Sequence, residues 1–277
     1  VIRDLIVDSS SYRRKVSNLR PFVQRTSPPV EEPEPLDLSA YSKYEKLSGC
    51  VDCLSCVAAC PSYEVAPSEF AGPLAFTMLA RRLHDSRDDA DRARMAMSEG
   101  LFLCSTCGKC KEVCQREIDV PMYAIRELCE SAVEEGLTIP PAHRELAEKA
   151  AKTGRAVDPV GTPLLQTEPV TIVPERRVAR VGLFTGCLFD YAMQDVGRAG
   201  IDVLRRNRVE VVLPKDQVCC GMPIFWTGQA KLAKEHFVKR NIEAFERAGV
   251  DTVLTMCAAC GMSWQKDVIP SAMELLG

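Results

Sequence analysis

The chain contains 277 residues, of which 46% are hydrophobic, and its formal net charge at pH 7 is −3. This length predicts two domains, or one large domain, with a sizeable core, and the charge argues against nucleic-acid binding. No apolar run is long enough to span a membrane and no secretory signal is visible, so we expect a cytoplasmic protein. Because the sequence begins with Val1 rather than methionine, we also expect a longer native chain.

Cysteine is unusually frequent, with 14 residues. Disulfide frameworks are typical of small secreted domains that cannot build a core of their own. Zinc sites typically use two separated pairs of ligands with a loop between them. The cysteine spacings here are tighter and are repeated, which favours iron–sulfur ligation over both alternatives.

Residues 1–38 are predicted to form an N-terminal segment that ends in a linker rich in proline and glutamate, "PPVEEPEP". A helical, cysteine-rich domain is predicted at 39–137. Within it, apolar residues at helical spacing predict one helix over 68–83, with Ser68 as its N-cap, and another over 120–136.

The pattern changes in the second half of the chain. Residues 138–178 are predicted as a helix followed by an interdomain linker, because several prolines and glycines interrupt any periodic pattern there. A separate domain is predicted at 179–277, with buried strands at 180–186, 209–214 and 251–256. Helical patterns lie between these strands, and this alternation predicts an α/β domain with a parallel sheet.

Eight cysteines form two runs with the spacing C-x2-C-x2-C-x3-C. The first run contains Cys50, Cys53, Cys56 and Cys60, and the second contains Cys104, Cys107, Cys110 and Cys114. In two-cluster ferredoxins the fourth cysteine of a run ligates the cluster of the other run. We therefore predict an α-helical dicluster ferredoxin domain that holds two [4Fe–4S] clusters. The predicted ligands are Cys50, Cys53, Cys56 and Cys114 for the first cluster, and Cys104, Cys107, Cys110 and Cys60 for the second.

The remaining candidates near these runs favour structural roles. Cys129 lies on the apolar side of the helix at 120–136 and fits neither run, so we expect a buried structural thiol. No histidine has a partner at ligand spacing, so none is predicted as a ligand; the three are His84, His143 and His236. The cations near the second run are predicted to be solvated surface; they are Lys109, Lys111 and Arg116. No catalytic residue is predicted.

The first half of the chain resembles the iron–sulfur subunits of succinate dehydrogenases and fumarate reductases. The resemblance rests on "SGCVDCLSCVAACPSY", "FAGPLAFTMLARRLHDSRD" and "LFLCSTCGKCKEVC". It implies a preceding [2Fe–2S] domain, whose cysteines are absent here, and a separate flavoprotein partner. Many such subunits lack one cysteine of the second run and hold [3Fe–4S] there, beside a quinone site. Cys107 is present in this chain, which favours a [4Fe–4S] cluster.

The second half resembles the cysteine-rich CCG domain of heterodisulfide reductases. The resemblance rests on "FTGCLFDY", "QVCCGMP" and "TMCAACG", whose cysteines stand at the family's spacing and directly follow the predicted strands. Ligands bind at the carboxyl ends of such strands. The resemblance implies one noncubane [4Fe–4S] cluster. Its ligands would be Cys187, Cys219, Cys220, Cys257 and Cys260. Family members usually carry two such motifs, so we expect this one to be the first of two.

Together the two halves resemble the thiol:fumarate reductases, which couple oxidation of the coenzyme M and coenzyme B thiols to fumarate reduction. Two redox alternatives remain: an iron–sulfur subunit of glycolate or lactate oxidase, and a subunit of a CCG-containing succinate:quinone reductase. A zinc-binding interaction module is a third alternative from a different class. Iron and sulfide analysis separates the third from the others.

Overall fold

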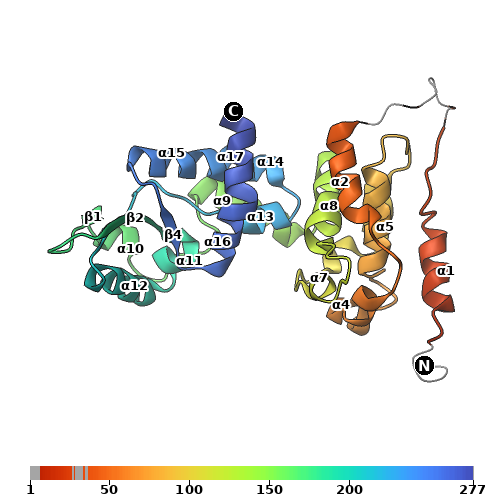
Figure 1. The fold of residues 1–277 in the computed structure, drawn as a ribbon, viewed down its shortest axis with the longest axis horizontal. Helices are drawn as coiled ribbons and strands as arrows, with labels where there is room; N and C mark the ends of the chain where they lie inside the picture. The colour runs from red at the N-terminus through yellow and green to blue at the C-terminus, as the bar shows by residue number, and fades with distance from the viewer. Residues whose placement is uncertain (1–6, 27, 29–33, 35–36, 277) are drawn as a thin grey trace. The chain divides into compact units, whose positions relative to one another are not determined.

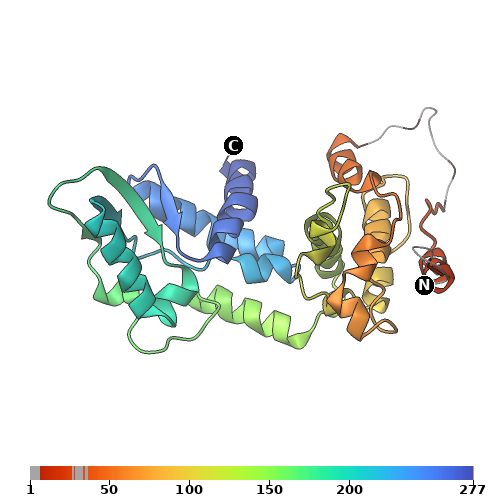
Figure 2. The ribbon, with the colours of Figure 1, turned by 60° about the horizontal axis from the view of Figure 1, so that its bottom comes forward.

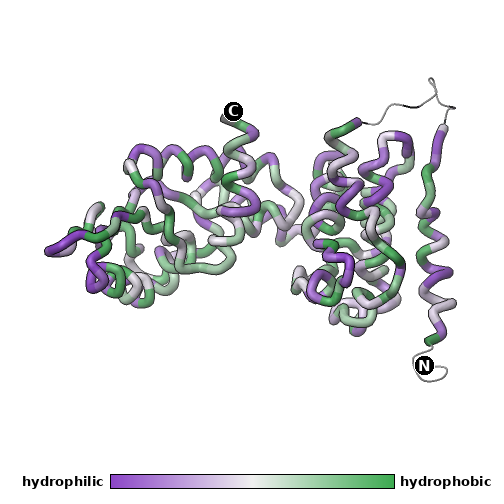
Figure 3. The backbone as a smooth tube through the Cα atoms, in the orientation of Figure 1, coloured by the Kyte–Doolittle hydropathy of each residue, from purple (hydrophilic) through white to green (hydrophobic). Residues whose placement is uncertain are grey.

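A computed structural model describes residues 7–26, 28, 34 and 37–276 (Figure 1). The chain divides into two compact units, Val1–Pro140 and Pro141–Gly277. Hydrophilic and hydrophobic residues alternate along the helices of both units, as expected for helices that bury one face (Figure 3). Within the described residues, no helix has the length and hydropathy needed to cross a membrane. Of the predicted proline- and glutamate-rich linker, only residues 28 and 34 lie among those described.

The first unit is helical. Its longer helices are α1 (Ser10–Asn18), α2 (Leu38–Ser48), α5 (Pro73–Leu83), α6 (Arg92–Ser98), η2 (Pro121–Arg126) and α8 (Glu127–Glu134). Short helices flank the cysteines: α3 (Ser55–Ala58), α4 (Pro61–Val65), η1 (Leu101–Leu103) and α7 (Lys109–Glu112). Helix α5 is the centre of this unit, because its residues 73–80 are all buried and it packs against α2, α6, η2 and α8.

The prediction that Ser68 caps this central helix is wrong. Helix α5 begins at Pro73, and Gly72 occupies the N-cap position with a φ of 86°. Proline suits the first position of a helix because its fixed φ is helical and its missing N–H would have no partner there. A Cβ at Gly72 would also crowd the side chains of Tyr63 and Tyr12. The helix predicted over 120–136 forms, but its first part, η2, is a π-helix.

The second unit contains a four-stranded sheet in the order β1-β3-β2-β4. The strands are β1 (Thr171–Ile172), β2 (Ala179–Phe184), β3 (Val209–Val212) and β4 (Val253–Thr255). The predicted parallel pairing is confirmed, since β2 runs parallel to both β3 and β4. Strand β1 was not predicted and pairs antiparallel with β3. It has two residues, which is too short for a period-2 pattern to be visible in the sequence.

Helices surround this sheet. They are α9 (Pro141–Thr153), α10 (Leu164–Thr167), α11 (Gly186–Tyr191), α12 (Gln194–Arg206), α13 (Met222–Trp226), α14 (Ala230–Ala233), η3 (Lys234–Val238), α15 (Lys239–Arg247), α16 (Ala258–Ser263), η4 (Trp264–Val268) and α17 (Ile269–Leu276). Residues 141–178, predicted as a helix and an interdomain linker, lie within this unit. Helix α9 packs against α13 and α14 (Figure 2), and Leu164 and Leu165 are buried beside Leu183. The predicted domain limits themselves stay a prediction.

Gly100 lies just before the second cysteine run, at a place where the first unit is tightly packed. It has a φ of 78°, and a Cβ there would collide with the Glu69 carbonyl oxygen. Gly136 has a similar φ of 69°, but a Cβ there would meet no atom within 4 Å. A left-handed conformation costs an L-residue about 1–2 kcal/mol in both places. We expect Gly100→Ala to lower the thermal unfolding midpoint clearly more than Gly136→Ala. Equal midpoints for the two variants would contradict this packing.

Candidate iron–sulfur sites

Four cysteines line a cavity of about 140 Å³ in the first unit; they are Cys50, Cys53, Cys56 and Cys114. The first three lie around the short helix α3, and the fourth follows α7. The structure therefore brings together three cysteines of the first run and the last cysteine of the second run. This is the set predicted for the first cluster, and its convergence supports that prediction.

The two runs share a backbone conformation with left-handed residues at the same two positions. In the first run Asp52 and Leu54 have left-handed φ values of 55° and 64°. In the second run Thr106 and Gly108, at the same offsets from the first cysteine, have φ values of 53° and 78°. Three of these four residues are not glycine, and such conformations cluster at functional sites. Each run thus folds into a tight loop.

The second set gathers around Cys110. Burial raises the pKa of Cys110 to about 12, with smaller contributions from Cys104, Cys56 and Cys60. Burial also raises the pKa of Cys104, and Cys60 and Cys107 add to that shift. Cys60, the last cysteine of the first run, therefore lies among the cysteines of the second run. Because Cys56 also acts on Cys110, the two sets are neighbours.

Cys50 and Cys56 of the first set are neutral near pH 7 when no metal is bound. Burial raises the pKa of Cys50 to about 11 and that of Cys56 to about 12. Cys53 is exposed, and its hydrogen bond with the Ser55 hydroxyl lowers its pKa. Thiolates are the form that ligates iron, so binding of a cluster releases protons from the buried thiols.

In the second unit the thiols form a continuous chain of contacts from Cys187 through Cys219 and Cys220 to Cys260. Cys187 follows β2, the adjacent pair follows β3, and Cys260 lies on α16 after β4. Cys219 contacts Cys187 and Cys220 contacts Cys260, so the adjacent pair reaches cysteines at two different strand ends. Cys257 is partly buried, stands at the N-cap of α16 and packs against the same apolar cluster.

These contacts shift the acidity of the thiols. Contact with Cys219, together with burial, raises the pKa of Cys187. The hydrogen bond with Cys187 lowers the pKa of Cys219, but contact with Cys220 and burial outweigh it and raise the pKa to about 12. A buried chain of thiols at the carboxyl ends of three parallel strands has the donor chemistry and position expected of an iron–sulfur site.

Buried amide side chains fix the loop that carries the adjacent cysteines. Gln217 accepts hydrogen bonds from the backbone N–H and hydroxyl of Thr185 and donates to the carbonyl of Leu183. Asn241 accepts from the N–H of Val218 at 2.8 Å and donates to the carbonyl of Cys219 at 2.9 Å. Neither residue was predicted, because a single amide in the sequence carries no signal of what it contacts.

Two smaller residues complete this site. The Ser263 hydroxyl donates to the carbonyl of Cys220 at 3.1 Å. Gly186 has a φ of 60°, and a Cβ there would lie 2.8 Å from Cys260 Sγ. Glycine is therefore required where the chain passes the Cys260 thiol. The place of Gly186 directly before Cys187 was the sequence signal that could have indicated it.

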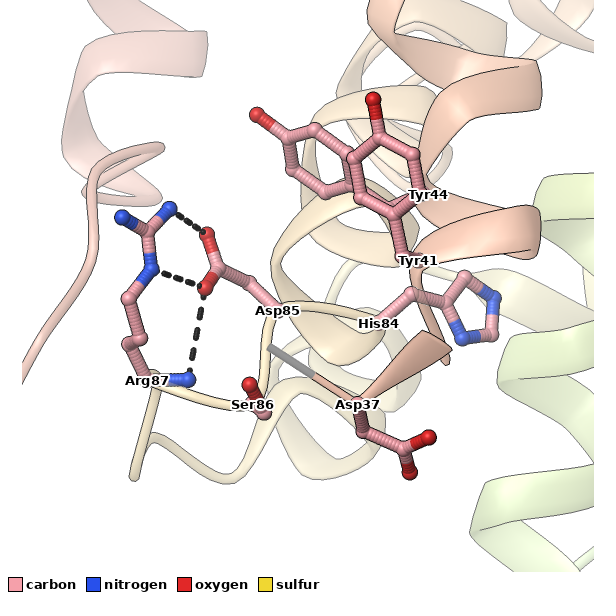
Figure 4. Close-up of a pocket in the computed structure, with 7 residues that line it drawn as sticks. All are labelled: Asp37, Tyr41, Tyr44, His84, Asp85, Ser86 and Arg87. Carbon is pink, nitrogen blue, oxygen red and sulfur yellow. Dashed lines mark hydrogen bonds and ion pairs between the residues drawn. The ribbon is translucent and has the colours of Figure 1, made fainter. Parts of the chain in front are cut away.

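The other candidates occupy structural positions. His84 lines a pocket with Tyr41, Tyr44 and Asp85 (Figure 4), and its Nε2 lies 3.8 Å from Glu127 Oε2. Cys129 is buried in the apolar core of the first unit, as predicted, and burial raises its pKa.

The three cationic residues near the second run form ion pairs or a hydrogen bond. Lys109 pairs with Glu112, and Lys111 pairs with Asp119. Arg116 lines the first cavity and donates to the Gly49 carbonyl. Among the described residues, no three His, Cys, Asp or Glu side chains are close enough to hold a single metal ion.

Two family models match the chain. One, described as a 4Fe-4S dicluster domain, matches residues 46–118, and the other, described as a cysteine-rich domain, matches residues 181–265. The first match contains both cysteine runs, and the second contains the contact chain at the strand ends. The predicted fold class is therefore confirmed. The chain thus joins a helical region that matches a 4Fe-4S dicluster domain to an α/β region that matches a cysteine-rich domain.

The chain is homologous to a component of a fumarate reductase. It is 40% identical over 275 residues to a subunit of the fumarate reductase (CoM/CoB) of Methanothermobacter marburgensis, and this match covers 99% of this chain and 54% of that protein. It is 41% identical over 267 residues to an uncharacterized iron-sulfur protein of Methanocaldococcus jannaschii, covering 96% and 54%. A stretch of 129 residues is 35% identical to the fumarate reductase iron-sulfur subunit of Escherichia coli O6:H1, covering 45% and 52%. The chain spans about half the length of these relatives.

Asn241 should be required to keep the C-terminal site loaded. In Asn241→Ala the Val218 N–H and the Cys219 carbonyl lose their buried partner, which costs about 1–3 kcal/mol for each unsatisfied group. We expect the iron content to fall from roughly twelve to roughly eight atoms per chain, if each of three clusters holds four irons. Asn207→Ala is the matched control, because Asn207 is exposed and its side chain bonds only to the Val203 carbonyl. Unchanged iron in Asn241→Ala would contradict this role.

Proposed function

We propose that the chain is the electron-transfer part of a thiol-dependent fumarate reductase. One observation carries the proposal: three converging sets of cysteines lie in a chain that is homologous over 99% of its length to part of a CoM/CoB fumarate reductase. Bound iron–sulfur clusters would carry electrons between a thiol/disulfide pair at the cysteine-rich domain and a flavoprotein. The protein would hold the clusters in place and adjust their reduction potentials.

The proposed ligands follow the three sets. The two cysteine sets of the first unit, each completed by the last cysteine of the other run, would hold two [4Fe–4S] clusters. Cys107 would supply the thiolate that a three-iron site lacks. The set of the second unit would hold a noncubane [4Fe–4S] cluster, with Cys219 and Cys220 reaching different irons. Its ligands would be Cys187, Cys219, Cys220, Cys257 and Cys260. Cys257 would complete the set from its position at the N-cap of α16.

The proposed partners lie outside this sequence. They are a flavoprotein of the fumarate reductase and succinate dehydrogenase type, a [2Fe–2S] domain, and a second CCG motif. We place the assembly in the cytoplasm, where thiols stay reduced. The similarity to fumarate reductase subunits along both parts of the chain favours fumarate over glycolate or lactate as the partner reaction.

If the last cysteine of each run ligates the cluster of the other run, then removing it should damage that other cluster. Cys114→Ala should damage the cluster held by Cys50, Cys53 and Cys56, because Cys114 lines their cavity. Cys60→Ala should damage the cluster of the second run instead. Electron paramagnetic resonance of the reduced variants would assign the lost signal, with Cys129→Ala as a control that should lose neither. If each variant lost the cluster of its own run, the crossover would be wrong.

The function itself is tested by reconstitution under anaerobic conditions. We expect the 277-residue chain to accept electrons from a chemical reductant but to reduce no fumarate with thiols. Addition of the flavoprotein and the remaining CCG half should allow thiol-dependent fumarate reduction. A quinol that replaced the thiols as electron donor in that mixture would support the succinate:quinone reductase alternative and contradict the proposal.

A further inference from the structure

Residues 154–156 border the C-terminal cysteine site although they precede the matched cysteine-rich region, which begins at residue 181. The Gly154 carbonyl accepts a hydrogen bond from the N–H of Cys219 at 2.8 Å. The N–H of Ala156 donates to Cys187 Sγ at 3.3 Å. This short segment therefore contacts the Cys187 thiol and the backbone of Cys219, the two cysteines that form the first link of the contact chain.

Arg155 lies between these two contacts and is buried, with 8% of its side chain exposed. Its Nε and Nη2 donate to Asp190 Oδ2 at 3.1 and 2.8 Å. Its Nη1 donates to the Gln217 carbonyl at 2.8 Å, and its guanidinium lies 5.3 Å from the centre of the Tyr191 ring. The forked guanidinium thus joins α11 to the loop that carries the adjacent cysteines.

Asp190 balances this charge. Its side chain is 2% exposed, and its second oxygen accepts the N–H of Leu165 at 2.9 Å. Burying an ion pair is costly unless its remaining hydrogen-bonding groups are satisfied, as they are here. Apolar residues of similar size often replace a buried ion pair without loss of stability, so packing alone does not explain these two charges.

This ion pair lies next to the Cys187 thiol in the chain. Arg155 directly precedes Ala156, whose N–H donates to Cys187 Sγ, and its partner Asp190 lies one helical turn after Cys187 on α11. The reduction potential of an iron–sulfur cluster depends on the charge around it and on hydrogen bonds to its sulfur ligands. A nearby cation stabilises the reduced state, which carries one more negative charge, and a nearby carboxylate destabilises it.

We propose that Arg155 is a positioning residue of the C-terminal site. Its guanidinium braces the loop of Cys219 and Cys220 and raises the reduction potential of the cluster ligated by Cys187, while Asp190 limits that increase. The inference rests on the proposed function, since it requires a cluster at this site.

Two variants that each remove one charge test the proposal, because they should shift the reduction potential of the C-terminal cluster in opposite directions. Arg155→Gln removes the cation and should shift the C-terminal cluster to a lower potential. Asp190→Asn removes the anion, keeps an oxygen for the Leu165 N–H, and should shift the same cluster to a higher potential. The potentials would be measured by redox titration of the loaded chain, followed by electron paramagnetic resonance. The two clusters of the first unit provide an internal reference that should not move.

Arg205→Gln is the matched control, because Arg205 is an exposed arginine of the same unit that pairs with Asp202. It should leave all three potentials unchanged. Shifts in the same direction for Arg155→Gln and Asp190→Asn, unchanged potentials, or loss of the C-terminal cluster in both would overturn the proposal. If the unsubstituted chain showed no C-terminal cluster signal, the proposed function would fail at this site. A normal signal with unmoved potentials would remove only the role of Arg155.

Discussion

The structure depends on one constraint: thiols from distant parts of the sequence must lie close together. A run of closely spaced cysteines supplies three ligands, and the fourth must come from elsewhere. In the first unit Cys114 meets the first run and Cys60 meets the second. The helices between the runs must therefore bring the two loops side by side. The central helix α5 belongs to this arrangement as well as to the core, because its Leu74 and Thr77 line the cavity of the first set.

The two units meet this constraint by different means. In the first unit, left-handed residues such as Asp52 and Thr106 bend each run of cysteines into a tight loop. The second unit needs no such loop, because its parallel strands end at one edge of the sheet. There the loops after β2, β3 and β4 deliver their cysteines to the same place.

Both sites are continuous with the apolar cores. Cys60 and Cys110 belong to the core of the first unit, and Cys219 and Cys260 belong to the core of the second. Burial raises the pKa of Cys110, and the pKa of Cys219 is raised as well, so binding of a cluster would change the charge inside each core. The buried Arg155 and Asp190 pair lies where that change occurs in the second unit. Loading with the proposed clusters would therefore be linked to the stability of the fold in both units.

The sequence by itself determined the features that depend on local spacing. Cysteine intervals predicted the ligand sets, and strands alternating with helices predicted the parallel sheet. Only the tertiary structure decided that Arg155 and Asn241 support the cysteine loop, and that Gly186 must pass the Cys260 thiol. The physical reason is that periodicity reports which face of an element is buried. Contacts such as that from Arg155 to Gln217 join residues far apart in sequence, and no local pattern marks them.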